Sequence, residues 1–358
     1  MKVLHVIDSL ATGGAEKLLV ESLPVFRKNN VDIDIALLNG KVTPFYNVVK
    51  DFGYNRIYNL YNGSVYNPIT ILRLVPILKK YGVVHVHLFP AQYYVVIAKV
   101  LGFSKCKLIF TEHSTSNRRL QNRRLRWIEK IVYSFYKKVI SITPEVQSEL
   151  KEKLNLPDNK LTVIENGVNI ANIESAESYS RENLGYNEDD RIILMVAGFR
   201  REKDHDTLIR CLSILPLNYK LLLVGDGERR KELETLVEFL RLEERIKFLG
   251  VRTDVYNLMK MVDISVLSSH WEGFGLVAVE AMSAGKPVIA SKVQGLEQVV
   301  EGGGLLFTKG DEIDLKNKIL ELEENEYYHE ISKSCVVKAK KYDINNTVSK
   351  LISLYEKI

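Results

Sequence analysis

The sequence predicts an α/β protein built from two doubly wound parallel sheets, and three observations support this prediction. Short runs of Val, Ile and Leu alternate with helical patterns along the whole chain. These runs are almost continuously apolar, as expected for parallel strands that are buried on both faces. The alternation occurs twice, on either side of a polar segment at residues 169–190. A chain of 358 residues is long enough for two domains with separate cores.

The elements follow one another in the order that doubly wound domains require. In the first half, strands are predicted at residues 2–7, 32–38, 83–89, 107–113, 138–143 and 161–166. In the second half, they are predicted at residues 191–198, 219–227, 245–250, 264–269 and 286–291. We therefore expect an N-terminal domain over residues 1–170 and a C-terminal domain over residues 171–342. Ligands of such folds bind at the carboxyl ends of the strands, so we expect a site in a cleft between the domains.

Composition excludes several classes of protein. No apolar run reaches the ~18–20 residues that span a bilayer, and the apolar stretch at the N-terminus is too short for a signal peptide. The three cysteines, Cys106, Cys211 and Cys335, match no disulfide or metal spacing. We found no recognition motif for nucleic acid. These features predict a cytoplasmic protein.

The net charge of +5 hides an asymmetry between the two halves. Residues 1–166 contain 24 Lys and Arg against 13 Asp and Glu, which gives +11. Residues 167–358 contain 26 against 32, which gives −6. Much of the positive charge falls in residues 118–138, which we interpret as one basic amphipathic helix. Such a helix can lie on an anionic membrane surface, or it can pack on the core with a solvated outer face.

Two glutamates in the second half stand in an unusual context. Glu280 interrupts an apolar helix predicted from Gly275 to Ala284, and Glu272 precedes that helix in a glycine-containing loop. The first amides of the helix, at Gly275, Leu276 and Val277, can bind phosphate oxygens. Carboxylates on either side would suit the hydroxyls of a ribose and of a second sugar. The alternative is that Glu280 pairs with a buried basic residue and Glu272 is exposed.

Other residues offer weaker signals. Gly13 and Gly14 follow the first strand, where backbone amides can face a phosphate or an acceptor. His113 ends a predicted strand and so faces the expected cleft, whereas we assign no chemistry to His85 and His87. No histidine or cysteine cluster has metal-ligand spacing, and we attribute Asp32 and Asp34 to strand alternation.

These motifs resemble those of glycosyltransferase family 4, whose members are retaining enzymes of the GT-B fold. The resemblance rests on "EGFGLVAVEAMSAGKPVIAS", "SLATGGAEKLL", "FTEHS", "VIENGV", "GFRREKDHDTLI", "LLVGDGERRKELE" and "FLGVRTDV", which occur in the order of the family. It covers nearly the whole chain. It also implies that the last helix, at about residues 343–358, packs back on the first domain.

The resemblance implies a role for individual residues. Glu280 would bind ribose hydroxyls, Glu272 the transferred sugar, and Lys203 the diphosphate, with His113 near the donor sugar. The family has an arginine where this chain has Gly198, so that Arg200 or Arg201 would replace it. The full set of expected donor-binding residues is Gly14, Lys203, Arg252, Glu272, Gly273, Phe274, Gly275, Leu276, Val277 and Glu280. The expected catalytic residues are Lys203, Arg200, Arg201, His113 and Glu272.

The expected activity is transfer of a hexose-type sugar, with retention, from a UDP- or GDP-sugar to a glycan or lipid-linked saccharide. Cations would neutralise the leaving diphosphate, so we expect neither a metal nor another cofactor. Cell-surface polysaccharide biosynthesis is the expected setting, on the inner face of the membrane. The alternatives are a sugar-nucleotide epimerase of the same fold and a non-catalytic partner of another transferase.

Overall fold

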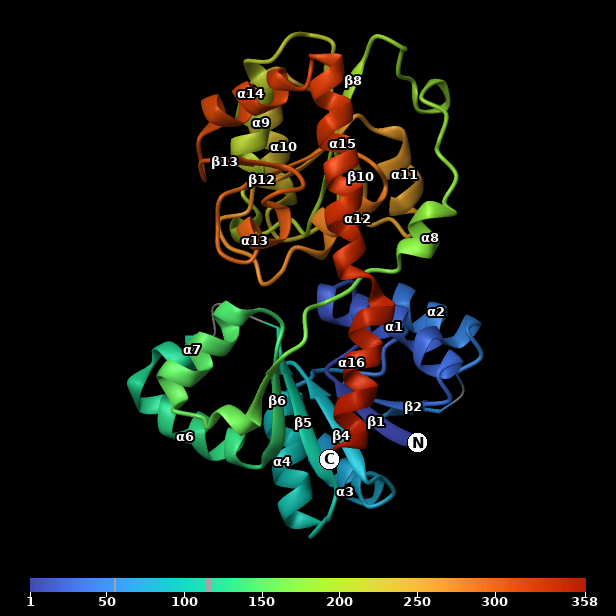
Figure 1. Ribbon diagram of the computed structural model, residues 1–358, viewed down its shortest axis with the longest axis vertical. Coiled ribbons are helices and arrows are strands. Elements are labelled where there is room, and N and C mark those ends of the chain that lie inside the picture. Colours follow the sequence, from blue (N-terminus) through green and yellow to red (C-terminus); the bar gives the residue numbers. More distant parts are fainter. Residues whose placement is uncertain (55, 114–117) are drawn as a thin grey trace. The chain divides into compact units, whose positions relative to one another are not determined.

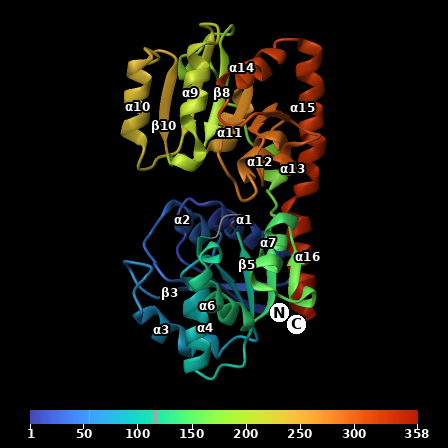
Figure 2. The same cartoon turned by 90° about the vertical axis from the view of Figure 1, so that its left-hand side faces the viewer.

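The computed structural model describes residues 1–54, 56–113 and 118–358, which form two compact units. Unit 1 contains Met1–Gly167 together with Ile344–Ile358, and unit 2 contains Val168–Asp343. Each unit has a parallel sheet with helices on both faces (Figures 1 and 2). The predicted α/β class and the two doubly wound sheets are therefore confirmed.

Unit 1 has a seven-stranded sheet in the order β3-β2-β1-β4-β5-β6-β7. Its strands are β1 (Lys2–Ile7), β2 (Asp32–Leu37), β3 (Ile57–Asn59), β4 (Val83–His87), β5 (Lys107–Glu112), β6 (Tyr136–Ser141) and β7 (Leu161–Val163). Its helices are α1 (Gly14–Lys28), α2 (Pro44–Asp51), α3 (Ile69–Leu78), α4 (Ala91–Leu101), α5 (Arg118–Gln121), α6 (Arg123–Ser134), α7 (Pro144–Leu154), η1 (Asp158–Lys160) and α16 (Ile344–Glu356).

Unit 2 has a six-stranded sheet in the order β10-β9-β8-β11-β12-β13. Its strands are β8 (Arg191–Val196), β9 (Tyr219–Val224), β10 (Ile246–Gly250), β11 (Ile264–Leu267), β12 (Val288–Ser291) and β13 (Leu305–Phe307). Its helices are α8 (Ile170–Glu174), η2 (Glu182–Leu184), η3 (Arg201–Lys203), α9 (His205–Ser213), α10 (Arg230–Phe239), α11 (Val255–Met261), α12 (Leu276–Ser283), α13 (Glu297–Val300), α14 (Glu312–Glu321), α15 (Asn325–Ala339) and η4 (Lys340–Tyr342).

Strand order reverses once in each sheet, and this reversal locates the place where a ligand can bind. In unit 1 the reversal lies between β1 and β4, where His5 is the register partner of His85. In unit 2 it lies between β8 and β11, where Ile193 is the partner of Ile264. In doubly wound sheets, loops leave in opposite directions at such a point, and ligands bind in the crevice that this forms at the carboxyl ends of the strands.

The last helix of the chain completes the core of unit 1. Residues of α16, including Val348, Leu351 and Tyr355, are buried in one cluster with Leu23 and Phe26 of α1. Figure 1 shows α16 beside α1 in unit 1. Burial of several large side chains, each contributing about 1.5–3 kcal/mol, holds this helix on the unit.

The structure differs from the sequence prediction in two respects. Strands β3 and β13, which have three residues each, were not predicted. Residues 118–138 are not one helix: α5 and α6 are separate, and the segment continues into β6. The apolar spacing favoured one helix, but Tyr136 is fully buried in β6, where strand pairing decides the conformation.

Candidate active site

Lys203 and Glu272 form an ion pair at the point in unit 2 where the strand order reverses. Lys203 ends η3, in the loop that follows β8, and Glu272 lies in the loop that follows β11. The two side chains are only 15% and 18% exposed. Two neighbouring loops of the sheet thus place a cation and a carboxylate in direct contact.

The loop after Glu272 is shaped by glycine. Gly275 has a φ of +82° and caps α12, whose predicted position is confirmed to within one residue at each end. Gly295 has a φ of +87°, and a Cβ there would lie 2.2 Å from the Glu272 carbonyl oxygen. Only glycine tolerates both the conformation and the close approach. The two glycines therefore fix the backbone that presents Glu272 and the amides of Gly275, Leu276 and Val277.

Glu280 and Phe274 are buried on either side of that helix start. Glu280 lies in the second turn of α12 and is 1% exposed. A buried carboxylate is costly unless hydrogen bonds or charges stabilise it, which is unusual in the body of an apolar helix. The Phe274 ring packs edge-on against Tyr342 at 5.3 Å. The Phe274 side chain thus anchors the loop and is not itself available to a ligand.

The arginines of unit 2 differ in their surroundings. Arg200 and Arg201 are both exposed, and Arg200 Nε lies 3.1 Å from Glu202 Oε1. The Arg200 guanidinium folds back towards Gly198, since a Cβ at Gly198 would lie 3.5 Å from Arg200 Nε and 3.9 Å from Nη2. Arg200 therefore places its charge beside Gly198, the position at which the resemblance implies an arginine.

Arg252 is held by a different group of residues. Its Nε donates to Asp254 at 2.8 Å, and its Nη2 lies 3.4 Å from the Tyr179 hydroxyl. The Arg252 guanidinium lowers the pKa of Asp254 to about 2. Arg252 thus follows β10, two strands away from β8 in the sheet, and its guanidinium is engaged with Asp254 and Tyr179.

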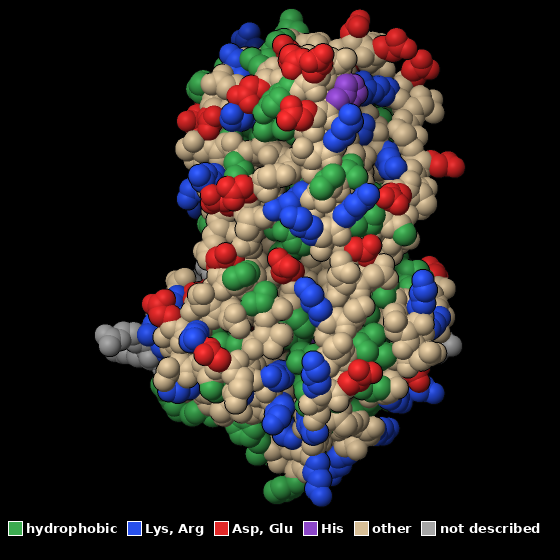
Figure 3. All heavy atoms as spheres, viewed as in Figure 1, with side chains coloured by type: hydrophobic (Ala, Val, Ile, Leu, Met, Phe, Trp, Pro, Cys, Tyr) green, Lys and Arg blue, Asp and Glu red, His purple; other side chains and the backbone are tan. Residues whose placement is uncertain are grey.

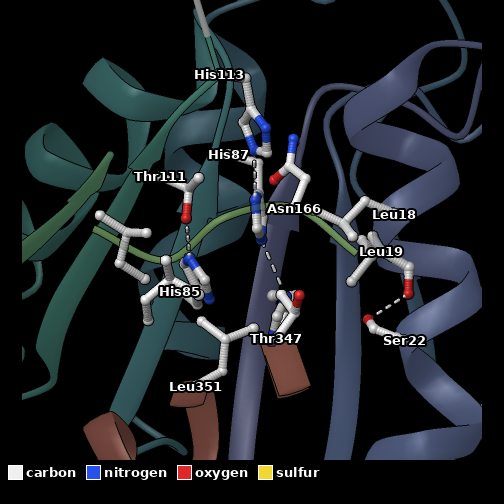
Figure 4. Close-up of a pocket in the computed structure, with 13 residues that line it drawn as sticks. Leu18, Leu19, Ser22, His85, His87, Thr111, His113, Asn166, Thr347 and Leu351 are labelled. Carbon is white, nitrogen blue, oxygen red and sulfur yellow. Dashed lines mark hydrogen bonds between the residues drawn. The ribbon is translucent and has the colours of Figure 1, made fainter. Parts of the chain in front are cut away.

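In unit 1, the predicted residues Gly14 and His113 lie at carboxyl ends of strands. Gly14 is the first residue of α1, in the connection that follows β1, and His113 directly follows β5. His113 is half-buried, and burial lowers its pKa to about 4, so the ring is neutral at pH 7. Its Nε2 lies 3.1 Å from His87 Nδ1. Figure 4 shows the two rings facing one another beside a small cavity of about 20 Å³.

Sequence reasoning missed a second group of residues near the end of β1. Asp8 accepts a hydrogen bond from the Ala91 amide at 3.1 Å, and burial raises its pKa to about 7. Arg119 donates to the buried Glu129 at 2.6 Å and to Gln92 at 3.2 Å. For Asp8, the only signal in the sequence was that it directly follows the first strand. Arg119 belongs to the basic segment at residues 118–138, whose charges were expected to face a membrane or solvent. For Arg119 this is wrong, because it pairs with a fully buried carboxylate.

Sequence reasoning also missed that three histidines meet in unit 1. His5, His85 and His87 each offer one ring nitrogen within 4.8 Å of the others, a group that could hold a metal ion. All three are buried. Sequence spacing gave no indication of this group, because the histidines come from β1 and β4, which pair although residues 8–82 lie between them.

Two doubly wound sheets, with a cation–carboxylate pair and a glycine-bounded helix start at the reversal point of the second, define a protein of the GT-B class. Two family models match the chain: Glycosyltransferase Family 4 over residues 12–172 and Glycosyl transferases group 1 over residues 177–342. Together they match most of the chain, which therefore belongs to this family of glycosyltransferases.

Individual relatives agree with this assignment. An uncharacterized glycosyltransferase of Methanocaldococcus jannaschii, MJ1178, is 36% identical over 61% of this chain and 59% of its own length. The chain thus spans about three fifths of that relative. An Escherichia coli UDP-Gal:alpha-D-GlcNAc-diphosphoundecaprenol alpha-1,3-galactosyltransferase is 26% identical over 80% of this chain and 78% of its own. The crystal structure of Anabaena HepE with UDP and glucose has a TM-score of 0.87 at 24% identity, with both chains fully covered, and shows the shared fold.

Proposed function

We propose that this protein is a retaining glycosyltransferase that moves a hexose-type sugar from a nucleotide-diphosphate sugar to a saccharide acceptor. The observation that carries the proposal is the Lys203–Glu272 pair beside the start of α12. Glu272 holds the Lys203 ammonium where a diphosphate would need it. On donor binding, Lys203 would turn to the phosphates, and Glu272 would accept hydrogen bonds from hydroxyls of the transferred sugar.

The remaining residues of unit 2 complete the proposed donor site. Amides at the start of α12 would bind phosphate oxygens, since their hydrogens point out of the helix. Glu280 would accept the two ribose hydroxyls. Arg200, rather than Arg201, would take the place of the family's arginine, because its guanidinium lies next to Gly198. Cations and amides aimed at the diphosphate stabilise the charge that develops as it departs, so the transfer would require no metal.

UDP is the nucleotide that the relatives favour. HepE was crystallised with UDP and UDP-glucose, and the Escherichia coli relative carries UDP-Gal in its name. The acceptor of that relative is a diphosphoundecaprenol-linked sugar. A lipid-linked saccharide is accordingly the acceptor that we propose here, in the biosynthesis of a surface polysaccharide.

Such an acceptor would place unit 1 at an anionic membrane surface. Trp127 and Ile131 lie four residues apart on α6 and are 62% and 49% exposed, and Phe135 continues this row just after the helix. Lys130 and Lys137 are exposed beside them. Figure 3 shows apolar and basic side chains together over the lower part of unit 1. Among the described residues, none of the helices is both long and apolar enough to cross a bilayer.

The deciding experiment is a donor panel with and without acceptor. Purified protein is incubated with UDP- and GDP-sugars, first alone and then with undecaprenyl-diphosphate-linked saccharides, and the products are identified by mass spectrometry and NMR. A new α-linked saccharide formed from an α-linked donor supports retention. An epimerised donor formed without acceptor would establish the isomerase alternative. Tight donor binding without any turnover would indicate a non-catalytic partner.

A further inference from the structure

The histidines of unit 1 form one continuous hydrogen-bonded chain that ends at His113. His5 Nδ1 lies 3.0 Å from His87 Nε2, and His87 Nδ1 lies 3.1 Å from His113 Nε2. At the inner end, the Tyr355 hydroxyl of α16 lies 3.3 Å from His5 Nε2 and 2.6 Å from His85 Nδ1. His85 Nε2 then meets the Thr111 hydroxyl at 2.7 Å. Figure 4 shows His87 below His113, and His85 joined to Thr111.

Every ring nitrogen of the three inner histidines is used in this chain. His5, His85 and His87 each contact one partner through Nδ1 and another through Nε2. A metal bound between them would have to replace several of these hydrogen bonds. The three rings therefore form a hydrogen-bond relay, and they do not direct free nitrogen lone pairs at one common point.

All four rings are neutral, which determines how many protons the chain holds. Burial lowers the pKa of His5 to about 3 and of His113 to about 4, and it lowers the pKa values of His85 and His87 well below 6.5. A neutral imidazole has one donor nitrogen and one acceptor nitrogen. Each nitrogen–nitrogen contact needs one proton. The nitrogen that carries the proton in one ring therefore determines which nitrogen carries it in the next ring.

Tyr355 determines the direction because its hydroxyl has a single proton. If Tyr355 donates to His85, then His5 must donate to Tyr355 through Nε2. His87 must then donate to His5, and His113 must donate to His87 through its own Nε2. If Tyr355 donates to His5 instead, every proton is reversed, and His113 carries its proton on Nδ1. Only these two directions satisfy every contact in the chain.

The distances favour the first direction. Hydroxyl donors make shorter hydrogen bonds than ring N–H donors, typically about 2.7–2.8 Å against about 2.9–3.0 Å. The contact from Tyr355 to His85 is 2.6 Å, whereas that from Tyr355 to His5 is 3.3 Å. The short contact is the one expected for the phenol as donor, and the long one suits a ring N–H donating to the phenol oxygen.

We propose that Tyr355, His85, His5 and His87 are positioning residues that hold His113 with its proton on Nε2, so that Nδ1 is presented as a hydrogen-bond acceptor. The partner of Nδ1 would be a hydroxyl of a bound sugar, which rests on the proposed function. The last helix of the chain, through Tyr355, would thereby set the chemistry of a ring at the carboxyl end of β5, although Tyr355 and His113 are separated by two further histidines.

The test reads the ring protons directly and requires no substrate. In protein labelled with ¹⁵N-histidine, long-range ¹H–¹⁵N spectra show which nitrogen of each ring carries the proton. We expect His113 to be protonated on Nε2 in the wild type. Tyr355→Phe removes the acceptor of the His5 Nε2–H group, so the chain should reverse and His113 should become protonated on Nδ1. Tyr54→Phe is the control, because this buried hydroxyl in unit 1 donates to the Leu23 carbonyl oxygen outside the chain.

Four outcomes decide the matter. Reversal at His113 in Tyr355→Phe but not in Tyr54→Phe supports the proposal. Protonation of wild-type His113 on Nδ1 overturns the direction, and an unchanged His113 in folded Tyr355→Phe overturns the coupling. Binding of one equivalent of Zn²⁺ or Co²⁺ that shifts all three inner rings would identify a metal site instead.

If Tyr355→Phe does not fold, Thr111→Val removes the acceptor at the other end and should reverse the same chain. Sugar transfer is assayed separately. A lack of sugar transfer would refute the proposed function, whereas the positions of the ring protons would still decide the proposal made here.

Discussion

Lys203 and Glu272 are 69 residues apart in the sequence, yet their side chains are in contact at the reversal point of one sheet. Since only about one sixth of either side chain is exposed, the pair is partly shielded from solvent, and its electrostatic interaction exceeds that of a surface ion pair. It occupies the position where a doubly wound sheet binds phosphate ligands. The first prediction concerns this pair.

Lys203→Met should weaken binding of a nucleoside diphosphate by about 10- to 100-fold, because a hydrogen bond to a charged group contributes about 1.5–3 kcal/mol. The transfer rate should fall further, since the lost cation also stabilises the departing diphosphate. Titration calorimetry with UDP and GDP, followed by turnover measurements, checks both effects. Lys292→Met is the matched control, because Lys292 forms an exposed ion pair with Glu297 at 3.5 Å. Equal losses in the two variants would contradict the role of Lys203.

Glu280→Ala should lose nucleotide affinity while the fold survives. Two hydrogen bonds from ribose hydroxyls to a charged acceptor suggest a loss of about 2–4 kcal/mol. Because Glu280 is buried, circular dichroism and thermal unfolding must first show that the variant is folded. Unaltered binding of the nucleoside diphosphate to a folded Glu280→Ala protein would refute the ribose role. A 2′-deoxy nucleotide provides a second check, since it should bind the wild type and the variant more nearly alike.

Transfer should proceed in EDTA at close to the untreated rate, because Lys203, an arginine and helix amides can together neutralise the diphosphate. The measurement is turnover after chelation and after readdition of magnesium or manganese. Loss of activity that either metal restores would overturn the cation-only mechanism. Asp34 would then be a poor candidate ligand, since it pairs with Lys2 at 3.0 Å and accepts a hydrogen bond from Tyr81.

The free energy of unfolding should fall as the pH is lowered from about 6.5 towards 4. The four neutral histidines of unit 1 have lowered pKa values in the folded protein, whereas in the unfolded chain they titrate near 6.5. The unfolded state then binds more protons, so lower pH favours it, by up to about 1.4 kcal/mol per pH unit for each histidine. Urea unfolding between pH 7.5 and 4.5 measures this slope.

Asp8 provides an internal control for the direction in which the free energy of unfolding changes with pH. Its pKa is raised to about 7, so between roughly pH 4 and 7 the folded state binds the extra proton and is stabilised as the pH falls. Asp8→Asn removes this opposing contribution and should make the loss of stability on acidification steeper than in the wild type. A shallower slope in Asp8→Asn, or a wild type equally stable at pH 7.5 and 4.5, would show that these groups titrate normally.

Wild-type protein should sediment with anionic vesicles in low salt and remain free of neutral ones. Each basic residue at such a surface contributes about 1 kcal/mol, and salt weakens the effect. Replacing Lys130 and Lys137 with Gln should reduce binding, as should Trp127→Ser. Phe239→Ser is the control, because Phe239 is an exposed aromatic residue of unit 2. No binding by any of these proteins would refute the membrane proposal and leave the glycosyltransferase proposal unaffected.

Arg119 should not be used in that experiment. Its Nε bonds to Glu129, which is fully buried and also accepts from the Tyr93 hydroxyl at 2.6 Å. Removing the guanidinium would leave a buried charge without its cation and would destabilise unit 1. Arg118, Arg123 and Arg124 also belong to the basic segment, but the structure describes only their backbone.

The parts of this molecule that sequence could predict are those governed by local pattern. Buried parallel strands are apolar throughout, and Gly285 and Pro287 mark the end of α12, so the sheets and that helix could be located. The Arg119–Glu129 pair could not, because it joins α5 to α6 across a break that the apolar spacing did not show. The histidine chain could not, because its members come from β1, β4, β5 and α16, which are far apart in sequence. The charge of Arg119 gave no hint that it is directed inward. His85 and His87, on one strand, looked like ordinary core residues, because their partners lie on other elements.

The position of α16 has a consequence for the order in which the protein is made. Residues 1–167 leave the ribosome long before Ile344–Ile358, and the whole of unit 2 is synthesised in between. At about 5–20 residues per second, this interval lasts roughly 10–40 s. During that time unit 1 lacks Val348, Leu351 and Tyr355, so its sheet is complete while the part of one face that α16 covers beside α1 remains exposed. Unit 2, whose residues are contiguous, can finish folding first. The earlier-synthesised unit would therefore be the later one to reach its native state.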